Sequence, residues 1–390
     1  MSTIQEETYR QESMKGIMLA LIFGLLAFAI QLKVAYDWGL FGGAPLSAGI
    51  TTTLSASLAS AGADSLLMGI VSALYEKKIF DSTLWGVSIA LIFYLNAALA
   101  FLVARKMRRA AVSVSIAVAA LTLMNPLGVE AFASRCCMHE LLYLTLLFCA
   151  LLTYRYRSHD DSPWQGGGRS ALMVLLQIAA AFVWDFGLLL FPQVALITLF
   201  ARYEGSRRER KRLAISLLLP MAVCWIVVSS LLIAFREPSP HPFLPVHTVL
   251  KQFFLAPVEG LFPLLNFDSA GQETITALAL ATYLVLLSMA FHGKATLGLI
   301  LAFFLGLVPW VFFREPTGSD FYISMPLLYL AMTTFKDLKG FGNFALSVYL
   351  VFAFVWMFQR LDDVQGQVRA PREESVLLEK SYFVPFRQLR

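Results

Sequence analysis

The sequence predicts an all-α fold, a polytopic integral membrane protein with about eleven transmembrane helices of roughly 20 residues each. Three observations lead to this class. Of the 390 residues, 58% are hydrophobic and only 15% are charged, whereas a soluble domain carries about 25% charged residues. Apolar runs of helix length recur along the chain, and the loops between them are alternately rich and poor in Arg and Lys.

The predicted spans follow the apolar runs in order. They cover residues 15–35, 84–104, 110–127, 138–154, 169–202 (as two short helices), 212–235, 273–291, 295–313, 321–335 and 342–358. Residues 1–358 therefore form the transmembrane domain, with 36–82 and 236–271 as large outer loops and 359–390 as a short extracytoplasmic tail.

The run over residues 169–202 is divided because one helix of that length would overshoot the bilayer at about 1.5 Å per residue. We predict that its two halves meet at Trp184 and Asp185 on the outer side. The division also keeps the basic loop 202–212 on the same side as the other basic loops.

The basic loops orient the chain, because short loops rich in Arg and Lys stay in the cytoplasm. They are the leader, 105–109, 155–169, 202–212, 292–294 and 336–339. This places the N-terminus in the cytoplasm and favours a bacterial inner membrane. The net charge of +5 lies mostly in these loops, which indicates topology and anionic lipid rather than nucleic acid as the basic partner.

Two outer segments are predicted to be more than connectors. Residues 45–75 are moderately apolar and suggest helices on the membrane surface, with a re-entrant hairpin as the alternative. Residues 236–271 combine six prolines with several Phe residues, which favours a structured lid over an apolar groove. The triplet Gly166–Gly168 is predicted to be a flexible linker in a cytoplasmic turn.

Charged residues gather at the outer ends of the spans. Asp37 follows the first span, where a carboxylate can act as a general base or merely cap a helix end. Arg135 and His139 are four residues apart and so share a helical face that can bind a phosphate oxyanion. An ion pair between Arg135 and Glu140 is an equally open interpretation.

Further polar residues are candidates at the same outer face. Lys251 and Arg314 are predicted to bind phosphate, unless they are plain surface charges. A second group is predicted to contact substrate or a metal: Asp64, Glu140, Asp185, His247 and Tyr322. Nothing in the spacing of these residues decides whether a divalent cation is needed.

The order of these segments resembles the GT-C superfamily of membrane glycosyltransferases, which use polyprenyl-phosphate-linked sugars. An acidic residue after the first span opens a long outer loop, as Asp37 does here. A polar break between two short helices is followed by a proline and a basic loop, as are Trp184 and Asp185. A late outer turn carries a basic residue, Arg314, before Tyr322 and Pro326.

The resemblance implies transfer of a sugar from a polyprenyl-phosphate donor to a glycan, lipid or protein acceptor on the periplasmic or lumenal face. Asp37 would then be the catalytic base, and Arg135, His139, Lys251 and Arg314 would bind the donor phosphate. Two positions differ from the family pattern, with Trp38 beside the first acidic residue and Asp185 at the break.

Other functions remain open from the sequence. A lipid-linked glycan polymerase or ligase needs similar outward Arg and His residues. A lipid-glycan flippase or other transporter needs a polar path, for which the spans offer only Gln31, Asn96, Gln177 and Tyr283. A non-catalytic protein partner in an envelope-assembly complex is a further class.

Overall fold

The computed structural model describes residues 82–125, 138–155, 163–200, 207–235, 245–262, 271–313, 322–334, 348–353, 355–357 and 359. Within these ranges every regular element is helical and none is a strand, which confirms the predicted all-α class for this part of the chain. The predicted span 15–35, residues 36–81 of the first outer loop and the tail after residue 359 lie outside the described residues, as do Asp37, Asp64, Arg135 and Arg314.

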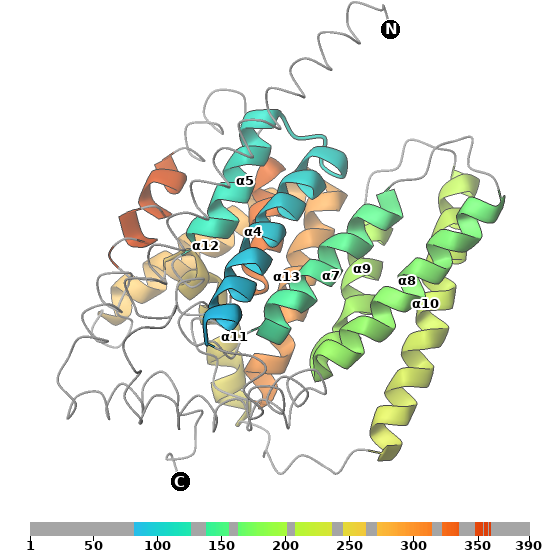
Figure 1. The fold of residues 1–390 in the computed structure, drawn as a ribbon. Helices are drawn as coiled ribbons and strands as arrows, with labels where there is room; N and C mark the ends of the chain where they lie inside the picture. Colours follow the sequence, from blue (N-terminus) through green and yellow to red (C-terminus); the bar gives the residue numbers. More distant parts are fainter. Residues whose placement is uncertain are drawn as a thin grey trace, which may run out of the picture.

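The helices follow the predicted spans closely (Figure 1). They are α4 (Ser82–Lys106), α5 (Val112–Met124), α7 (Met138–Arg155), α8 (Pro163–Val183), the 3-10 helix η1 (Asp185–Leu189), α9 (Leu190–Phe200), α10 (Arg207–Phe235), α11 (Val246–Leu261), α12 (Gln272–His292), α13 (Lys294–Phe313) and α15 (Met325–Met332). Helix α11 lies within the segment predicted as a structured outer loop.

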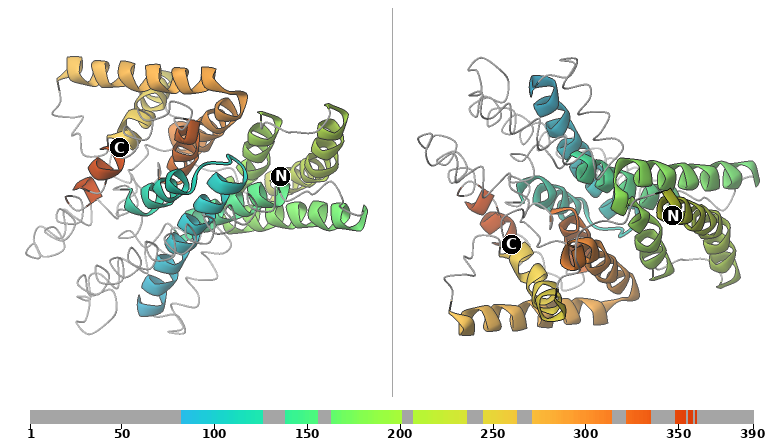
Figure 2. Two further views of the ribbon diagram at one scale, coloured as in Figure 1. Left: turned by 90° about the horizontal axis from the view of Figure 1, so that it is seen from above. Right: turned by 90° about the horizontal axis from the view of Figure 1, so that it is seen from below.

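Neighbouring helices pack into a bundle, with α8 (green) and α12 (yellow-orange) at its periphery (Figure 2). Helix α4 packs on α5 and α7, α7 on α8, and α8 on α10. Helix α13 connects the two sides, because it contacts α9 as well as α11, α12 and α15.

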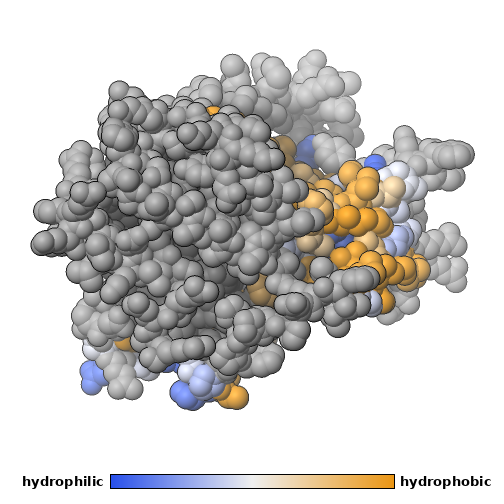
Figure 3. All heavy atoms as spheres, turned by 60° about the horizontal axis from the view of Figure 1, so that its bottom comes forward, coloured by the Kyte–Doolittle hydropathy of each residue, from blue (hydrophilic) through white to orange (hydrophobic). Residues whose placement is uncertain are grey.

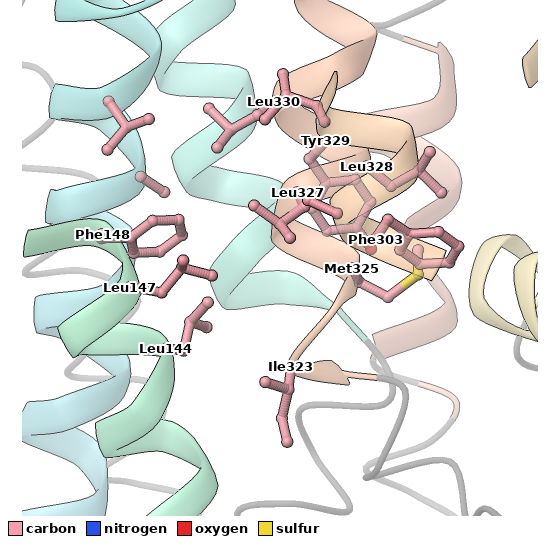
Figure 4. Packing of buried hydrophobic residues seen from close by; sticks show 14 of the residues in the cluster. Leu144, Leu147, Phe148, Phe303, Ile323, Met325, Leu327, Leu328, Tyr329 and Leu330 are labelled. Atoms are coloured by element: carbon pink, nitrogen blue, oxygen red, sulfur yellow. The ribbon is translucent and has the colours of Figure 1, made fainter. Parts of the chain in front are cut away.

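The short helix α15 forms the centre of the core. All of its residues, from Met325 to Met332, are buried. A helix that is apolar on every face is stable only when other helices surround it, and α15 contacts α13, α5 and α4. Figure 4 shows Met325 beside Phe303 of α13, and Leu144, Leu147 and Phe148 of α7 on the side toward α4.

The prediction of a flexible linker at Gly166–Gly168 was wrong, because these residues lie inside α8. The helix begins at Pro163, and a proline with its fixed φ suits the first helical position. The apolar residues that follow in α8 pack on the neighbouring helices α7 and α10. An added Cβ at Gly167 or Gly168 would meet no atom within 4 Å, so no neighbour requires glycine there.

Two helical segments are both long and apolar enough to cross a membrane, namely Val87–Lys106 and Glu273–Phe291. The other apolar helical stretches among the described residues have 10–17 residues. By length and composition alone, two such segments are weak evidence for a membrane protein.

The bundle has two contrasting ends. At one, the Arg108 guanidinium follows α4 and donates hydrogen bonds to Thr296 at the start of α13 and to Thr333 and Thr334 after α15. We call this the Arg108 end. At the other, which we call the Trp184 end, α7 begins at Met138 and α8 ends at Val183.

Candidate functional site

The chain turns sharply at Trp184, as the sequence predicts. Helix α8 ends at Val183, and Trp184 is extended with φ −152° and ψ 138°. Asp185 opens η1, which leads directly into α9. The predicted break at Trp184 and Asp185 is therefore confirmed, and it separates a helix of 21 residues from one of 11 residues.

Glycine is required at one position of this turn. The Gly187 amide donates to the Trp184 carbonyl at 2.8 Å, which folds η1 back against the last turn of α8. A Cβ on Gly187 would overlap the backbone carbonyl of Ala180. Backbone atoms cannot move aside as a flexible side chain can, so only glycine allows this close approach. The Gln177 side chain lies 3.4 Å from the Gly187 carbonyl and adds a contact between α8 and η1.

Trp184 is the centre of a cluster that we call the Trp184 cluster, comprising His139, Glu140, Tyr143 and Trp184. Its indole is buried, with the Tyr143 ring edge-on at 5.1 Å and the His139 ring tilted at 6.2 Å between centroids. His139 and Tyr143 are four residues apart on α7 and so lie on the same face. The Phe186 ring also meets Trp184 edge-on, with 5.3 Å between centroids.

Two ionisable side chains are buried at the first turn of α7. His139 is 8% exposed and Glu140 is 3% exposed. The His139 Nε2 atom lies 3.8 Å from the Glu140 Oε1 atom, within ion-pair range. Burying two ionisable groups is costly unless each has a partner or a task, so this pair is the strongest candidate for chemistry among the described residues.

A metal site is not formed by the described part of the chain, where no group of three His, Cys, Asp or Glu residues comes together. His139 and Glu140 provide two possible ligands from one helix turn. A divalent cation at this end would need further ligands.

Lys251 and His247 are not brought to the Trp184 cluster. Both are exposed on α11. Phe253 of α11 packs on Phe304 of α13, with 5.0 Å between ring centroids. The face of α13 that carries Ala302 instead meets α9, so α11 and α9 lie on opposite sides of α13.

The remaining candidates have different surroundings. The buried Tyr322 hydroxyl donates to the Thr122 carbonyl at 2.9 Å, and its ring lies 5.1 Å from Phe93. These contacts fix the start of α15 against α4 and α5, which supports a packing role. Asp185 is the first residue of η1, next to Trp184 in the chain.

Sequence reasoning did not single out Gln193 as part of this region. Gln193 is buried in α9 and accepts a hydrogen bond from the Tyr143 hydroxyl at 2.6 Å. Its amide also donates to the Ala302 carbonyl of α13 at 3.0 Å. The sequence feature that could have indicated this residue is that Gln193 is the one polar side chain in the apolar stretch 188–197.

Comparison of the chain with protein-family models, curated proteins and solved structures finds no match.

Proposed function

We propose that this chain is a polytopic membrane protein that transfers a sugar from a polyprenyl-phosphate donor to an acceptor at the Trp184 end of the bundle. The observation that carries the proposal is the burial of the neighbours His139 and Glu140, with His139 packed beside Trp184 at the helix break and away from the basic Arg108 end.

The surface of the bundle supports a membrane location. Helices α8, α10 and α12 expose apolar residues at helical spacing, namely Leu172, Leu175, Ile178 and Phe182 on α8, Ile215, Leu219, Val223 and Ile226 on α10, and Leu280, Leu284, Leu287 and Phe291 on α12. Figure 3 shows apolar surface on the side of the molecule where α8 and α10 lie. Soluble monomers rarely expose apolar stripes of this extent, whereas lipid covers them readily.

The interior supports the same location, because three prolines each leave the carbonyl four residues earlier without its usual backbone donor. Two of them lie inside α10 and α11, and the third, Pro192, lies in the first turn of α9. Ser170 of α8 donates to the Ser216 carbonyl freed by Pro220, at 2.8 Å. Trp225 of α10 donates to the Leu188 carbonyl freed by Pro192, also at 2.8 Å.

The third case is Pro257 in α11, which frees the Phe253 carbonyl. The Tyr283 hydroxyl of α12 lies 3.4 Å from that oxygen and 3.2 Å from the Phe254 carbonyl. Helices in lipid tolerate proline when a neighbouring helix supplies the missing donor, because no water is present to do so.

The sidedness of the bundle supports the placement of the reaction. The Arg108 end carries Arg105, Lys106 and Arg109, which are residues typical of a cytoplasmic loop. The Trp184 cluster lies at the opposite ends of the helices and would face the extracytoplasmic leaflet. Residues 226–235 of α10 extend about 15 Å beyond Trp225, so the cluster is recessed below the end of that helix.

The chemistry follows from the leaving group. The bond between the anomeric carbon of the sugar and the phosphate oxygen breaks, while the acceptor oxygen bonds to that carbon and its proton passes to a base. Polyprenyl phosphate departs with the bonding electrons, so a cation aimed at its phosphate stabilises the transition state. His139 and Arg135 would bind the phosphate, Glu140 and Asp185 the sugar hydroxyls, and Asp37 would take the proton.

The transport alternative has less support. The Asn96 amide donates to the Leu141 carbonyl at 3.0 Å and accepts from Thr145 at 2.8 Å. Tyr283 bonds to α11. These two polar groups of the spans therefore form hydrogen bonds between helices, which supports a structural role for them.

Cysteine labelling tests the membrane location and its sidedness. The four native cysteines are replaced, and a single cysteine is placed at His247 or at Arg208. A membrane-impermeant maleimide added to intact cells should label position 247 and reach position 208 only after lysis. Labelling of 208 in intact cells would contradict the proposed orientation.

Transfer is tested on the purified protein in nanodiscs, with a panel of radiolabelled polyprenyl-phosphate sugars and crude acceptor lipid. Glu140→Gln and His139→Gln should each lower turnover by about 100-fold, the usual scale for losing a group that acts on the transition state. Glu273→Gln, which alters an exposed carboxylate on α12, is the matched control and should retain turnover. Wild-type turnover in both His139 and Glu140 variants would overturn the site.

A further inference from the structure

A buried polar connection links α13 to the Trp184 cluster through α9 and α7. It starts at the Ala302 carbonyl of α13, which accepts from the Gln193 amide at 3.0 Å. The Gln193 Oε1 atom then accepts from the Tyr143 hydroxyl at 2.6 Å. Both side chains are at most 2% exposed, so these bonds face little competition from water.

The connection continues through rings to His139. Tyr143 meets Trp184 edge-on at 5.1 Å, an arrangement that favours one relative orientation of the two rings. Trp184 in turn packs beside the imidazole of His139 at 6.2 Å. The position of the His139 ring therefore depends on where the Tyr143 ring is held.

Among the residues that the structure describes, the Tyr143 hydroxyl has one hydrogen-bond partner, the Gln193 side-chain amide. The Gln193 amide is itself held at both ends, so it cannot rotate without losing a hydrogen bond. Thr198 offers a contrast, because this buried polar residue of α9 bonds only to carbonyls of its own helix, those of Val194 and Ala195.

We propose that Gln193 is a positioning residue of the transfer site, which fixes His139 through Tyr143 and Trp184. The catalytic consequence rests on the proposed function, whereas the structural consequence does not. Gln193 touches no reacting atom in this role. Gln193 instead sets the position of the His139 ring, which does contact the substrate in the proposed reaction. Small errors in the position of such a group lower turnover more than they weaken substrate binding.

The structural consequence is tested by the reactivity of His139 toward diethyl pyrocarbonate, measured residue by residue by mass spectrometry. The exposed His247 serves as the internal reference. Tyr143→Phe removes only the hydroxyl, and Gln193→Met keeps the length of the side chain while removing both hydrogen bonds. In each variant we expect the ratio of His139 to His247 modification to rise at least about threefold, as expected when a packed ring loses its fixed position.

Three comparisons make the result specific. Thr198→Val should leave the ratio at the wild-type value, because Thr198 has no bond to another helix in the structure. The double variant Tyr143→Phe with Gln193→Met should resemble either single variant, because both changes break the same hydrogen bond. In the transfer assay, kcat should fall about tenfold in Tyr143→Phe while KM stays near its wild-type value.

The outcomes separate the two proposals. If His139 reactivity rises in the variants and no protein, wild type included, transfers sugar, the proposed function fails and the positioning role of Gln193 stands. If the wild type transfers sugar and Tyr143→Phe changes neither His139 reactivity nor kcat, the positioning role is overturned. Equal increases in His139 reactivity in Thr198→Val and Gln193→Met would also overturn it.

Discussion

The Arg108 end and the Trp184 end of the bundle both hold charged side chains, but in different surroundings. At the Arg108 end, the guanidinium donates to Thr333, Thr296 and Thr334 at 2.8–3.0 Å. The hydroxyls of Thr333 and Thr334 donate hydrogen bonds to the Leu330 and Ala331 carbonyls of α15, which leaves their lone pairs to accept from the arginine. This arrangement connects three remote parts of the chain.

At the Trp184 end, His139 and Glu140 are neighbours in sequence and lie 3.8 Å apart. The Trp184 ring packs beside the His139 imidazole, and the Tyr143 ring packs edge-on against Trp184. The comparison suggests which buried charge to assign to structure and which to chemistry. A charge that joins three distant parts of the chain through neutral hydroxyls stabilises the fold, whereas two ionisable side chains that are adjacent in sequence and buried at a helix end are the better candidates for chemistry.

The largest expected effect is at the break that forms the Trp184 end. Gly187→Ala should lower the free energy of unfolding by more than about 3 kcal/mol or prevent folding, because the added Cβ overlaps the Ala180 carbonyl. Reversible unfolding in mixed detergent micelles measures the change. Gly168→Ala is the matched control in open space and should stabilise α8 by up to about 1 kcal/mol. A stable Gly187→Ala protein would mean that η1 does not lie against α8.

The next effect concerns the Arg108 end. Arg108→Gln should lower the free energy of unfolding by about 2–3 kcal/mol, because charge-assisted hydrogen bonds to three hydroxyls are lost. Sugar transfer per folded molecule should remain near the wild-type value. The exposed Lys294 at the start of α13 provides the control, since Lys294→Gln should change stability by less than about 0.5 kcal/mol. A loss of transfer without a loss of stability in Arg108→Gln would remove the contrast between the two ends.

The smallest effect lies between the ends, at the proline of α11. Tyr283→Phe should cost about 1 kcal/mol, since it removes the donor that serves the carbonyls of Phe253 and Phe254. The cost should shrink when Pro257→Ala is also present, because the restored backbone N–H can bond to the Phe253 carbonyl. A double-mutant cycle on unfolding free energies measures this coupling, and a coupling of zero would contradict the explanation.

The sequence predicts the order of helices and the break well, because both follow from local composition. The length of the apolar run 169–202 and the polar residue Asp185 suffice to locate the turn. The helical state of Gly166–Gly168 is not predictable in the same way, since a glycine triplet favours a loop and only its attachment to the rest of α8 makes it helical.

The candidate site is predicted less completely, because its geometry depends on contacts between distant segments. His139 and Glu140 stand out in the sequence as ionisable residues at a span end, and both belong to the Trp184 cluster. The separation of Lys251 from that cluster depends on which face of α13 receives α11, and no pattern in α11 encodes this. The bond between Tyr143 and Gln193 joins residues 50 positions apart.

The hydrogen bonds to proline-freed carbonyls also determine how α10 can move. Ser216 and Trp225 attach this helix to α8 and to η1 at two levels, separated along α10 by about 14 Å of helix rise. Sliding α10 by one turn would break both attachments together. Helix α10, the start of α8 and η1 are therefore expected to move together, because Trp225 holds the Leu188 carbonyl four residues after Trp184.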